Sequence, residues 1–257
     1  MAYRDLRDYV AALEKRGKLK RIRKEVDKDW EIAAVCRQLF TKISPQWRPA
    51  LVFENVKGFN IPVVAGVLGA SSIGLEVDSV EGINRKWDHA LSNPIAPRLV
   101  NGNASPCKEN ILHGKDVDIT RLPVPIWTVG EDLGPFFSSP YVITKDPETG
   151  MCNVGTYRMQ VKGRDKTGFL IGKRQDASWH IQKNDLRNKP TPVAVVIGAD
   201  PSIGYVSVSK ILDNLDEFAV AGALRGEAID LVPCESIPLE VPATAEFVLE
   251  GEIRPMR

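Results

Sequence analysis

The chain has 257 residues, a formal net charge of +1, 43% apolar residues and 26% charged residues. These values are typical of a globular protein with a substantial core, in one large or two small domains. A net charge so near zero gives no sign of a nucleic-acid partner. The four cysteines are scattered without a Cys-x-x-Cys spacing, which indicates reduced thiols in a cytoplasmic protein rather than a zinc or redox pair.

The amino end has none of the features of a targeting segment. Residues 1–13 carry charge throughout, and no run of 18 or more apolar residues occurs in the chain. We therefore expect no signal peptide and no membrane span.

The first 115 residues combine helical patterns with short strands. Apolar residues recur at helical spacing over 5–16, ahead of Gly17, and again over 30–40, where Asp29 is a plausible N-cap. The segment 15–24 holds seven basic residues and no acidic one, which favours a solvated edge strand. Further strands are expected at 51–54 and 62–68. We predict an α/β amino-terminal domain over residues 1–115.

Residues 116–257 are predicted to form a second domain made mainly of strands. Prolines are frequent between 93 and 140, so this region should contain long connections. One helix is expected over 215–225, with Asn214 or Asp213 as its cap and Gly226 as its terminator. Turn residues support hairpins and therefore an antiparallel sheet or barrel. The expected strands are 141–145, 154–161, 168–172, 193–198, 228–234 and 245–253.

Segment 150–158, Gly-Met-Cys-Asn-Val-Gly-Thr-Tyr-Arg, combines a carboxamide, a glycine and a guanidinium. In a strand, Asn153, Gly155 and Tyr157 share one face, and Arg158 falls on the other unless the chain bends. Gly155 permits such a bend and a close approach by a ligand. An amide oxygen suits a divalent cation and an arginine suits a phosphate, so the segment could hold a metal-phosphate group. Alternatively, Asn153 caps a hairpin turn and Arg158 meets solvent.

Two further residues could complete such a site. His180 lies between Trp179 and Ile181, and a neutral imidazole can bind manganese or a similar ion, although an ordinary surface histidine is the alternative. Glu217 lies in the first turn of its predicted helix, where the helix dipole favours a carboxylate. Its helix face continues into small and apolar residues, so the carboxylate would need a partner. With Asn153, these residues would form a mixed nitrogen and oxygen site with open positions.

Taken in order, these motifs resemble the UbiD family of reversible decarboxylases, which use prenylated FMN. The resemblance runs through nearly the whole chain. It rests on Asn-x-Gly-x-Tyr-Arg at 153–158, Ser-Trp-His-Ile at 178–181, Asp-Glu-Phe-Ala-Val-Ala-Gly at 216–222 and Leu-Glu-Val-Pro-Ala-Thr-Ala-Glu-Phe-Val-Leu-Glu-Gly at 239–251. It implies that residues 116–257 form a flavin-binding, split-barrel-like β domain that is cut short at its carboxy end.

The resemblance also implies roles for individual residues. Asn153, His180 and Glu217 would be ligands of a divalent metal, Mn²⁺ or Mg²⁺, that bridges the protein and the flavin phosphate, with K⁺ as a further candidate ion. Arg158 would lie by the flavin and assist catalysis. The cofactor would also be lined by Gly155, Thr156, Tyr157, Trp179 and Ser207.

The reaction implied by the family is the non-oxidative loss of carbon dioxide from an aromatic or α,β-unsaturated carboxylic acid. A flavin prenyltransferase would supply the cofactor, and the chain would form a homo-oligomer or pair with a complementary subunit. In the family a glutamic acid in a Glu-Gly-Pro-Phe-Gly-Glu/Asp type segment follows the Val-Leu-Glu-Gly strand, but this sequence ends at Arg-Pro-Met-Arg. Glu246, Glu250 and Glu252 do not match that acid, so no proton donor is assigned.

Three functions follow from these observations. The first is the cofactor-binding portion of a prenylated-FMN-dependent decarboxylase. The second is a non-catalytic flavin-binding or assembly subunit of a split decarboxylase or carboxylase. The third, a simple FMN reductase, would oxidise NAD(P)H, and the sequence has no Gly-x-Gly-x-x-Gly fingerprint, although barrel-type reductases need not carry one.

Overall fold

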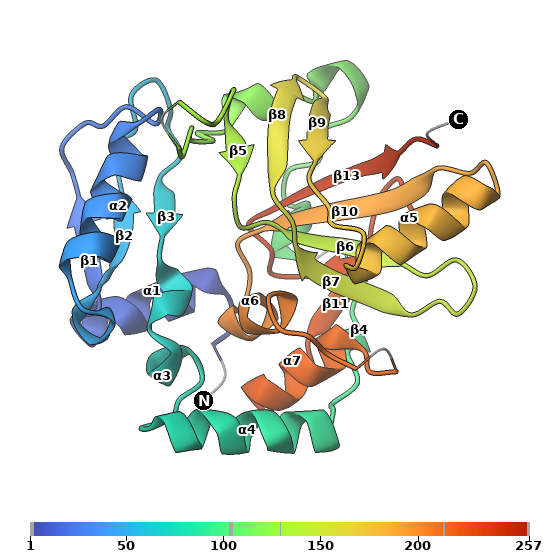
Figure 1. Cartoon of the computed structure of the whole chain (residues 1–257), viewed down its shortest axis with the longest axis horizontal. Helices are drawn as coiled ribbons and strands as arrows, with labels where there is room; N and C mark the ends of the chain where they lie inside the picture. Colours follow the sequence, from blue (N-terminus) through green and yellow to red (C-terminus); the bar gives the residue numbers. More distant parts are fainter. Residues whose placement is uncertain (1–2, 103–104, 129, 213, 256–257) are drawn as a thin grey trace.

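A computed structural model describes residues 3–102, 105–128, 130–212 and 214–255, and it has the mixed α/β architecture predicted (Figure 1). The amino-terminal part holds a three-stranded sheet in the order β1-β2-β3. Its elements are α1 (Leu6–Lys15), β1 (Leu19–Ile22), α2 (Glu31–Lys42), β2 (Ala50–Phe53), β3 (Val63–Ala65), α3 (Ser71–Gly74) and α4 (Val80–Ser92).

Two helices pack on this small sheet because the residues of β2 alternate between its faces. Ala50 joins the core cluster that contains Tyr9 and Leu13 of α1, whereas Leu51 joins the cluster that contains Ile32 of α2. The basic strand β1 lies at the sheet edge, as predicted, with its two central residues exposed.

The start of α2 differs from the prediction. Asp29 does not cap this helix; the N-cap position is Trp30, which has φ 74° and makes no side-chain capping bond. Instead, the Glu31 carboxylate accepts a hydrogen bond from the backbone N–H of Asp27 at 2.6 Å, and the Asp29 carboxylate pairs with Lys28.

The second part is organised around an antiparallel four-stranded sheet in the order β13-β10-β6-β7, so β7 is an edge strand. Within the described residues this sheet stays open rather than closing into a barrel. Two further three-stranded sheets have the orders β12-β11-β4 and β5-β8-β9. The strands are β4 (Arg98–Leu99), β5 (Phe136–Phe137), β6 (Tyr141–Lys145), β7 (Cys152–Thr156), β8 (Met159–Gly163), β9 (Lys166–Phe169), β10 (Thr191–Ile197), β11 (Asp230–Pro233), β12 (Glu240–Pro242) and β13 (Phe247–Ile253).

Helices cover both faces of the four-stranded sheet. On one face, Ala177 of α5 (Asp176–Leu186) packs in the cluster that contains Val142 and Val195. On the other face, α6 (Pro201–Ser207) and α7 (Glu217–Arg225) contribute to the largest cluster, where Phe218 packs with Ile143. Figure 1 shows α6 and α7 between this sheet and α4.

Three predictions for this part were wrong in detail. The expected strand 154–161 is interrupted after Thr156, and its two pieces, β7 and β8, belong to different sheets. One helix was expected, but α5 and α6 are also present. The cap of α7 is Asp216, whose carboxylate accepts hydrogen bonds from the backbone N–H groups of the first turn; Asn214 is not the cap, and Asp213 lies outside the described residues.

The end of α7 was predicted correctly, because Gly226 terminates it with φ 89°, in the left-handed region that glycine adopts readily. Across the ranges that the structure describes, no helix combines the length and apolar character needed to cross a membrane.

Candidate functional site along the edge strand β7

Asn153 is a buried amide in the edge strand β7. Its side chain shares a face of the sheet with that of Thr144, because the two residues lie directly opposite each other in the β6–β7 ladder. Asn153 is 4% exposed, and its Nδ2 donates to the Tyr157 hydroxyl at 3.3 Å. This bond directs the amide N–H toward Tyr157 and leaves Oδ1 as the atom that could bind a cation.

His180 reaches the same face of the sheet from α5. Its Nδ1 lies 2.9 Å from the hydroxyl oxygen of Thr144, and both residues are buried. Burial lowers the pKa of His180, which opposes the raising effect of Asp146, so the neutral imidazole is favoured. A neutral imidazole is the form that binds a metal.

Glu217 approaches β7 from the first turn of α7, on the other side of the strand edge. Its carboxyl lies by the backbone of Val154, and burial is the main reason why its pKa is raised to about 8. Its Oε2 is buried and has no hydrogen-bond partner among the described residues. A buried carboxylate oxygen without a partner is unfavourable, and a bound cation would remove that penalty.

The structure brings Asn153 and His180 to the face of the sheet that α5 covers, whereas Glu217 comes from α7 on the opposite face. Asn153 belongs to the strand, His180 is joined to it through Thr144, and Glu217 lies by its free edge. Among the described residues, no three His, Cys, Asp or Glu side chains lie close enough together to hold a metal ion. An amide, an imidazole and a carboxylate fit a divalent cation with oxygen-rich coordination.

Gly155 lies inside β7 and leaves room for the ring of Tyr157. A Cβ atom at this position would lie 2.5 Å from the ring of Tyr157, so only glycine lets that ring fold back over the strand. The ring also makes an edge contact with Phe169, with the centroids 5.4 Å apart. The bend between β7 and β8 lies at Tyr157 and Arg158 rather than at Gly155, which stays paired with Val142 in the ladder.

Thr156 and Ser207 connect β7 to α6. The Ser207 hydroxyl donates to the carbonyl of Gly204 at 2.9 Å, so the hydroxyl of Thr156, at 2.8 Å, donates to Ser207. Trp179 lies next to buried His180 on α5 but is 54% exposed. Of the residues predicted to line the cofactor, Trp179 is thus the one that faces solvent.

Arg158 leaves the strand beyond the bend and makes contacts of a different kind. Its guanidinium donates to the Asp132 carboxylate at 2.6 Å and stacks on Phe136, 4.1 Å from the ring centroid. The same carboxylate accepts hydrogen bonds from the backbone N–H groups of Trp127 and Thr128. The bond from Arg158 is the main reason why the pKa of Asp132 is lowered.

Thr144 and Asp132 were not among the residues predicted from the sequence. Thr144 follows Tyr-Val-Ile at 141–143, and its small hydroxyl side chain in a buried strand was a signal that could have been used. Asp132 lies in a turn-rich segment, and nothing in the neighbouring sequence indicates that its side chain pairs with Arg158.

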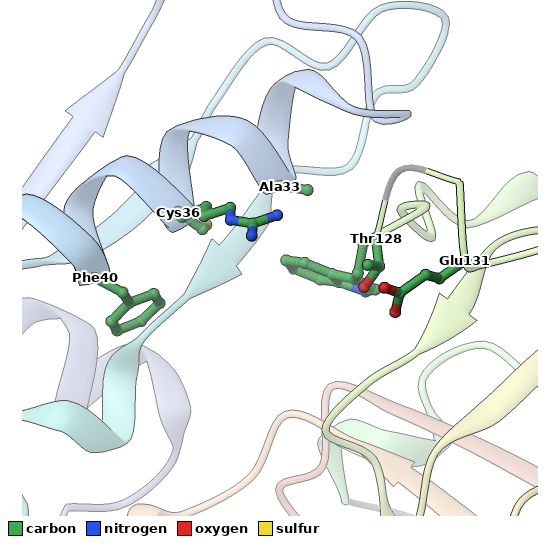
Figure 2. A pocket seen from close by; sticks show the side chains of 7 residues that line it. Ala33, Cys36, Phe40, Thr128 and Glu131 are labelled. Atoms are coloured by element: carbon green, nitrogen blue, oxygen red, sulfur yellow. The ribbon is translucent and has the colours of Figure 1, made fainter.

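A separate cleft of about 460 Å³ opens between α2 and the loop that carries Asp132. Figure 2 shows Cys36 and Phe40 of α2 on one side, and Thr128 and Glu131 on the other. Its lining includes none of the predicted site residues. Glu131 directly precedes Asp132, so one wall of the cleft adjoins the carboxylate that pairs with Arg158.

Comparison with known proteins adds two family matches. Residues 98–257 match the family described as the 3-octaprenyl-4-hydroxybenzoate carboxy-lyase Rift-related domain, and residues 10–83 match the N-terminal domain of the same carboxy-lyase. The chain is 36% identical to a phenolic acid decarboxylase from Sedimentibacter hydroxybenzoicus over 98% of this chain and 55% of that protein.

Solved structures show the same relationship. The UbiD-class enzyme HmfF from Pelotomaculum thermopropionicum in complex with FMN is 37% identical, with a TM-score of 0.90 over 98% of this chain and 55% of that one. An evolved dimeric form of HmfF in complex with prFMN also has a TM-score of 0.90, and the match covers 58% of that chain. The vanillic acid decarboxylase ShVdcCD of S. hydroxybenzoicus, in open form with truncated ShVdcD, is 34% identical, with a TM-score of 0.87 over all of this chain and 55% of that one. The chain thus spans about half the length of these relatives.

Proposed function

Because the chain belongs to the UbiD carboxy-lyase family, we propose that it is the cofactor-binding part of a prenylated-FMN-dependent decarboxylase. Its substrate would be an aromatic or α,β-unsaturated carboxylic acid. The observation that carries the proposal is the unpartnered, buried Oε2 of Glu217 beside the strand that bears Asn153. We propose that this Oε2 coordinates a divalent cation when the cofactor is bound.

The three residues at the edge of β7 would hold the metal and, through it, the flavin phosphate. Asn153 would contribute its amide oxygen, His180 its Nε2 and Glu217 its carboxylate. The ion would be Mn²⁺ or Mg²⁺, with K⁺ as an additional candidate. The hydroxyls of Thr156 and Ser207, which already bond to each other, would lie along the same side of the cofactor as Gly155 and Tyr157.

Bound prenylated FMN would supply the electron sink for the loss of carbon dioxide, and the protein would supply orientation and electrostatics. Arg158 is suited to stabilise negative charge that develops on the substrate, because Asp132 and Phe136 fix its guanidinium in place. Trp179 would cover the cofactor from α5. A flavin prenyltransferase would provide the cofactor.

The test is to co-express the chain with a flavin prenyltransferase and to measure bound flavin by mass spectrometry and bound metal by elemental analysis. We expect both in wild-type protein, and a loss of both in Asn153→Ala, His180→Ala and Glu217→Ala. The exposed residues His113 and Glu227 provide matched controls, because His113→Ala and Glu227→Ala should retain both. Unchanged metal content in all three site variants would refute the site.

A second candidate is a flavin-binding or assembly subunit that does not turn over substrate alone. The solved ShVdcCD with truncated ShVdcD supports the idea that more than one component takes part in such an enzyme. Alternatively, the second component would be another copy of the same chain, in a homo-oligomer. The two candidates differ in one result: the decarboxylase releases carbon dioxide from an aromatic acid when loaded with cofactor, and the assembly subunit does so only after a partner chain is added.

A further inference from the structure

Thr144 is a fully buried hydroxyl residue in the middle of the four-stranded sheet. It is 0% exposed, and it follows three apolar residues in β6. A buried hydroxyl without a partner would be unfavourable, so its choice of partner is informative. Among the described residues that partner is Nδ1 of His180, at 2.9 Å.

The position of Thr144 places it between two of the proposed ligands. It lies directly opposite Asn153 in the β6–β7 ladder, and it contacts His180 of α5. The Asn153 amide is itself held by the hydroxyl of Tyr157. Each of these two ligands is therefore oriented by a neighbouring hydroxyl group, and neither hydroxyl belongs to the ligand set.

The hydrogen bond to Thr144 bears on which nitrogen of the imidazole can coordinate. A neutral imidazole carries one proton, on Nδ1 or on Nε2. If Nδ1 carries it, Nδ1–H donates to Thr144, and the lone pair of Nε2 is available to a cation. If Thr144 donates to Nδ1 instead, the proton lies on Nε2, and that nitrogen cannot coordinate.

We propose that Thr144 is a positioning residue of the metal site: its hydroxyl oxygen accepts the Nδ1 proton of His180 and so holds the imidazole in the tautomer whose Nε2 binds the cation. Such a bond also fixes the orientation of the ring toward β7. The inference rests on the proposed function, because it needs His180 to be a ligand. It adds to that proposal the residue that makes His180 able to coordinate.

The test combines tautomer and affinity measurements. Long-range ¹H–¹⁵N correlation NMR on metal-free protein with labelled histidine reports which nitrogen carries the proton, and His180→Gln identifies the signal among the three histidines. Free Mn²⁺ measured by electron paramagnetic resonance, in the presence of FMN, gives the metal affinity. Thr144→Val keeps nearly the same shape but removes the acceptor, whereas Thr144→Ser keeps the hydroxyl.

We expect the Nδ1–H tautomer in the wild type and in Thr144→Ser, a mixture of tautomers in Thr144→Val, and Mn²⁺ binding that is about tenfold weaker in Thr144→Val. An Nε2–H tautomer in the wild type would overturn the inference. Folded Thr144→Val that binds Mn²⁺ within about twofold of the wild type would also overturn it. If Thr144→Val does not fold, the tautomer measured in the wild type still tests the proposed role of Thr144.

The same experiment separates this inference from the proposed function. Mn²⁺ affinity that is unchanged in His180→Gln would refute the metal site itself, and the role of Thr144 would fall with it. Affinity that drops in His180→Gln but not in folded Thr144→Val would leave the metal site standing and refute only the role of Thr144.

Discussion

Polar groups lie at both ends of the stretch from Asn153 to Arg158, and the protein satisfies them in different ways. Before the bend, the buried Oε2 of Glu217 has no partner among the described residues. Beyond the bend, the charge of Arg158 is compensated by Asp132, which is itself held by two backbone N–H groups. The first group has an oxygen without a partner, whereas the second is paired within the chain.

The two ends should therefore respond differently to mutation. Loss of the Glu217 carboxylate should remove the free-energy cost of burying it in the metal-free protein, and it should weaken ligand binding. Loss of a group at the Arg158 end should weaken the fold itself. The following predictions test this contrast, in order of decreasing effect on the free energy of unfolding.

The largest effect is expected from pH acting on Glu217 in protein stripped of metal. The pKa of this carboxyl is about 8 in the folded chain against an ordinary value of 4.5, so the folded state binds the proton more tightly. Stability should therefore fall as pH rises from about 4.5 to about 8, by up to about 1.4 kcal/mol per pH unit, and then level off. Urea titrations should show that the unfolding free energy of Glu217→Gln lacks this dependence on pH. Identical pH profiles for the variant and the wild type would show that burial does not raise the pKa of Glu217.

Gly155→Ala tests the bend that separates the two ends. The added Cβ would clash with the Tyr157 ring, so the ring must move away, and the variant should lose about 1–3 kcal/mol of unfolding free energy. Displacement of the ring should also release Asn153 from the Tyr157 hydroxyl. Gly251→Ala in β13 is the matched control, because a Cβ there meets nothing within 4 Å. Equal stability of the two variants would show that the bend does not depend on glycine.

Asp132→Asn tests whether the Arg158 end is complete in the protein alone. The neutral amide weakens the bond to the guanidinium, so we expect a loss of about 1 kcal/mol at neutral pH. The pKa of Asp132 is lowered in the folded state, so this contribution is fully present above its ordinary value and is lost progressively as pH falls from there through the lowered folded-state value. Denaturation at about pH 7 and about pH 3 should show a larger difference between variant and wild type at the higher pH. A difference that persists in acid would point to packing instead.

Trp179→Ala should have the smallest effect on stability. The side chain is 54% exposed, so the free energy of unfolding should change by less than about 0.5 kcal/mol. Flavin retention should nevertheless fall, because we propose that this residue covers the cofactor. A variant that retains as much flavin as the wild type would remove Trp179 from the proposed site.

Much of the fold could be predicted because it depends on local patterns. The helical spacing of α1, the basic edge strand β1 and the glycine that ends α7 all appear in the structure. Helix α5 was not predicted because three of its four buried residues, Ser178, His180 and Asn184, are polar. Hydrophobic periodicity cannot detect a helix that buries polar groups.

The predicted site residues were found through a motif resemblance rather than through spacing. Their spacing allowed two arrangements for Asn153 and Arg158, and only the tertiary structure shows that Asn153 is buried while Arg158 pairs with Asp132. Thr144 and Asp132 are 9 and 26 residues away from Asn153 and Arg158, respectively, and their contacts arise from strand pairing and loop placement. Such contacts leave no periodic signal in the sequence.

The most direct test of the metal site is an anomalous scattering experiment on crystals grown with FMN and Mn²⁺. We predict one strong manganese peak at the free edge of β7, within coordination distance of Asn153 Oδ1, His180 Nε2 and the Glu217 carboxylate. A manganese peak elsewhere, or flavin bound with no peak at this edge, would contradict it.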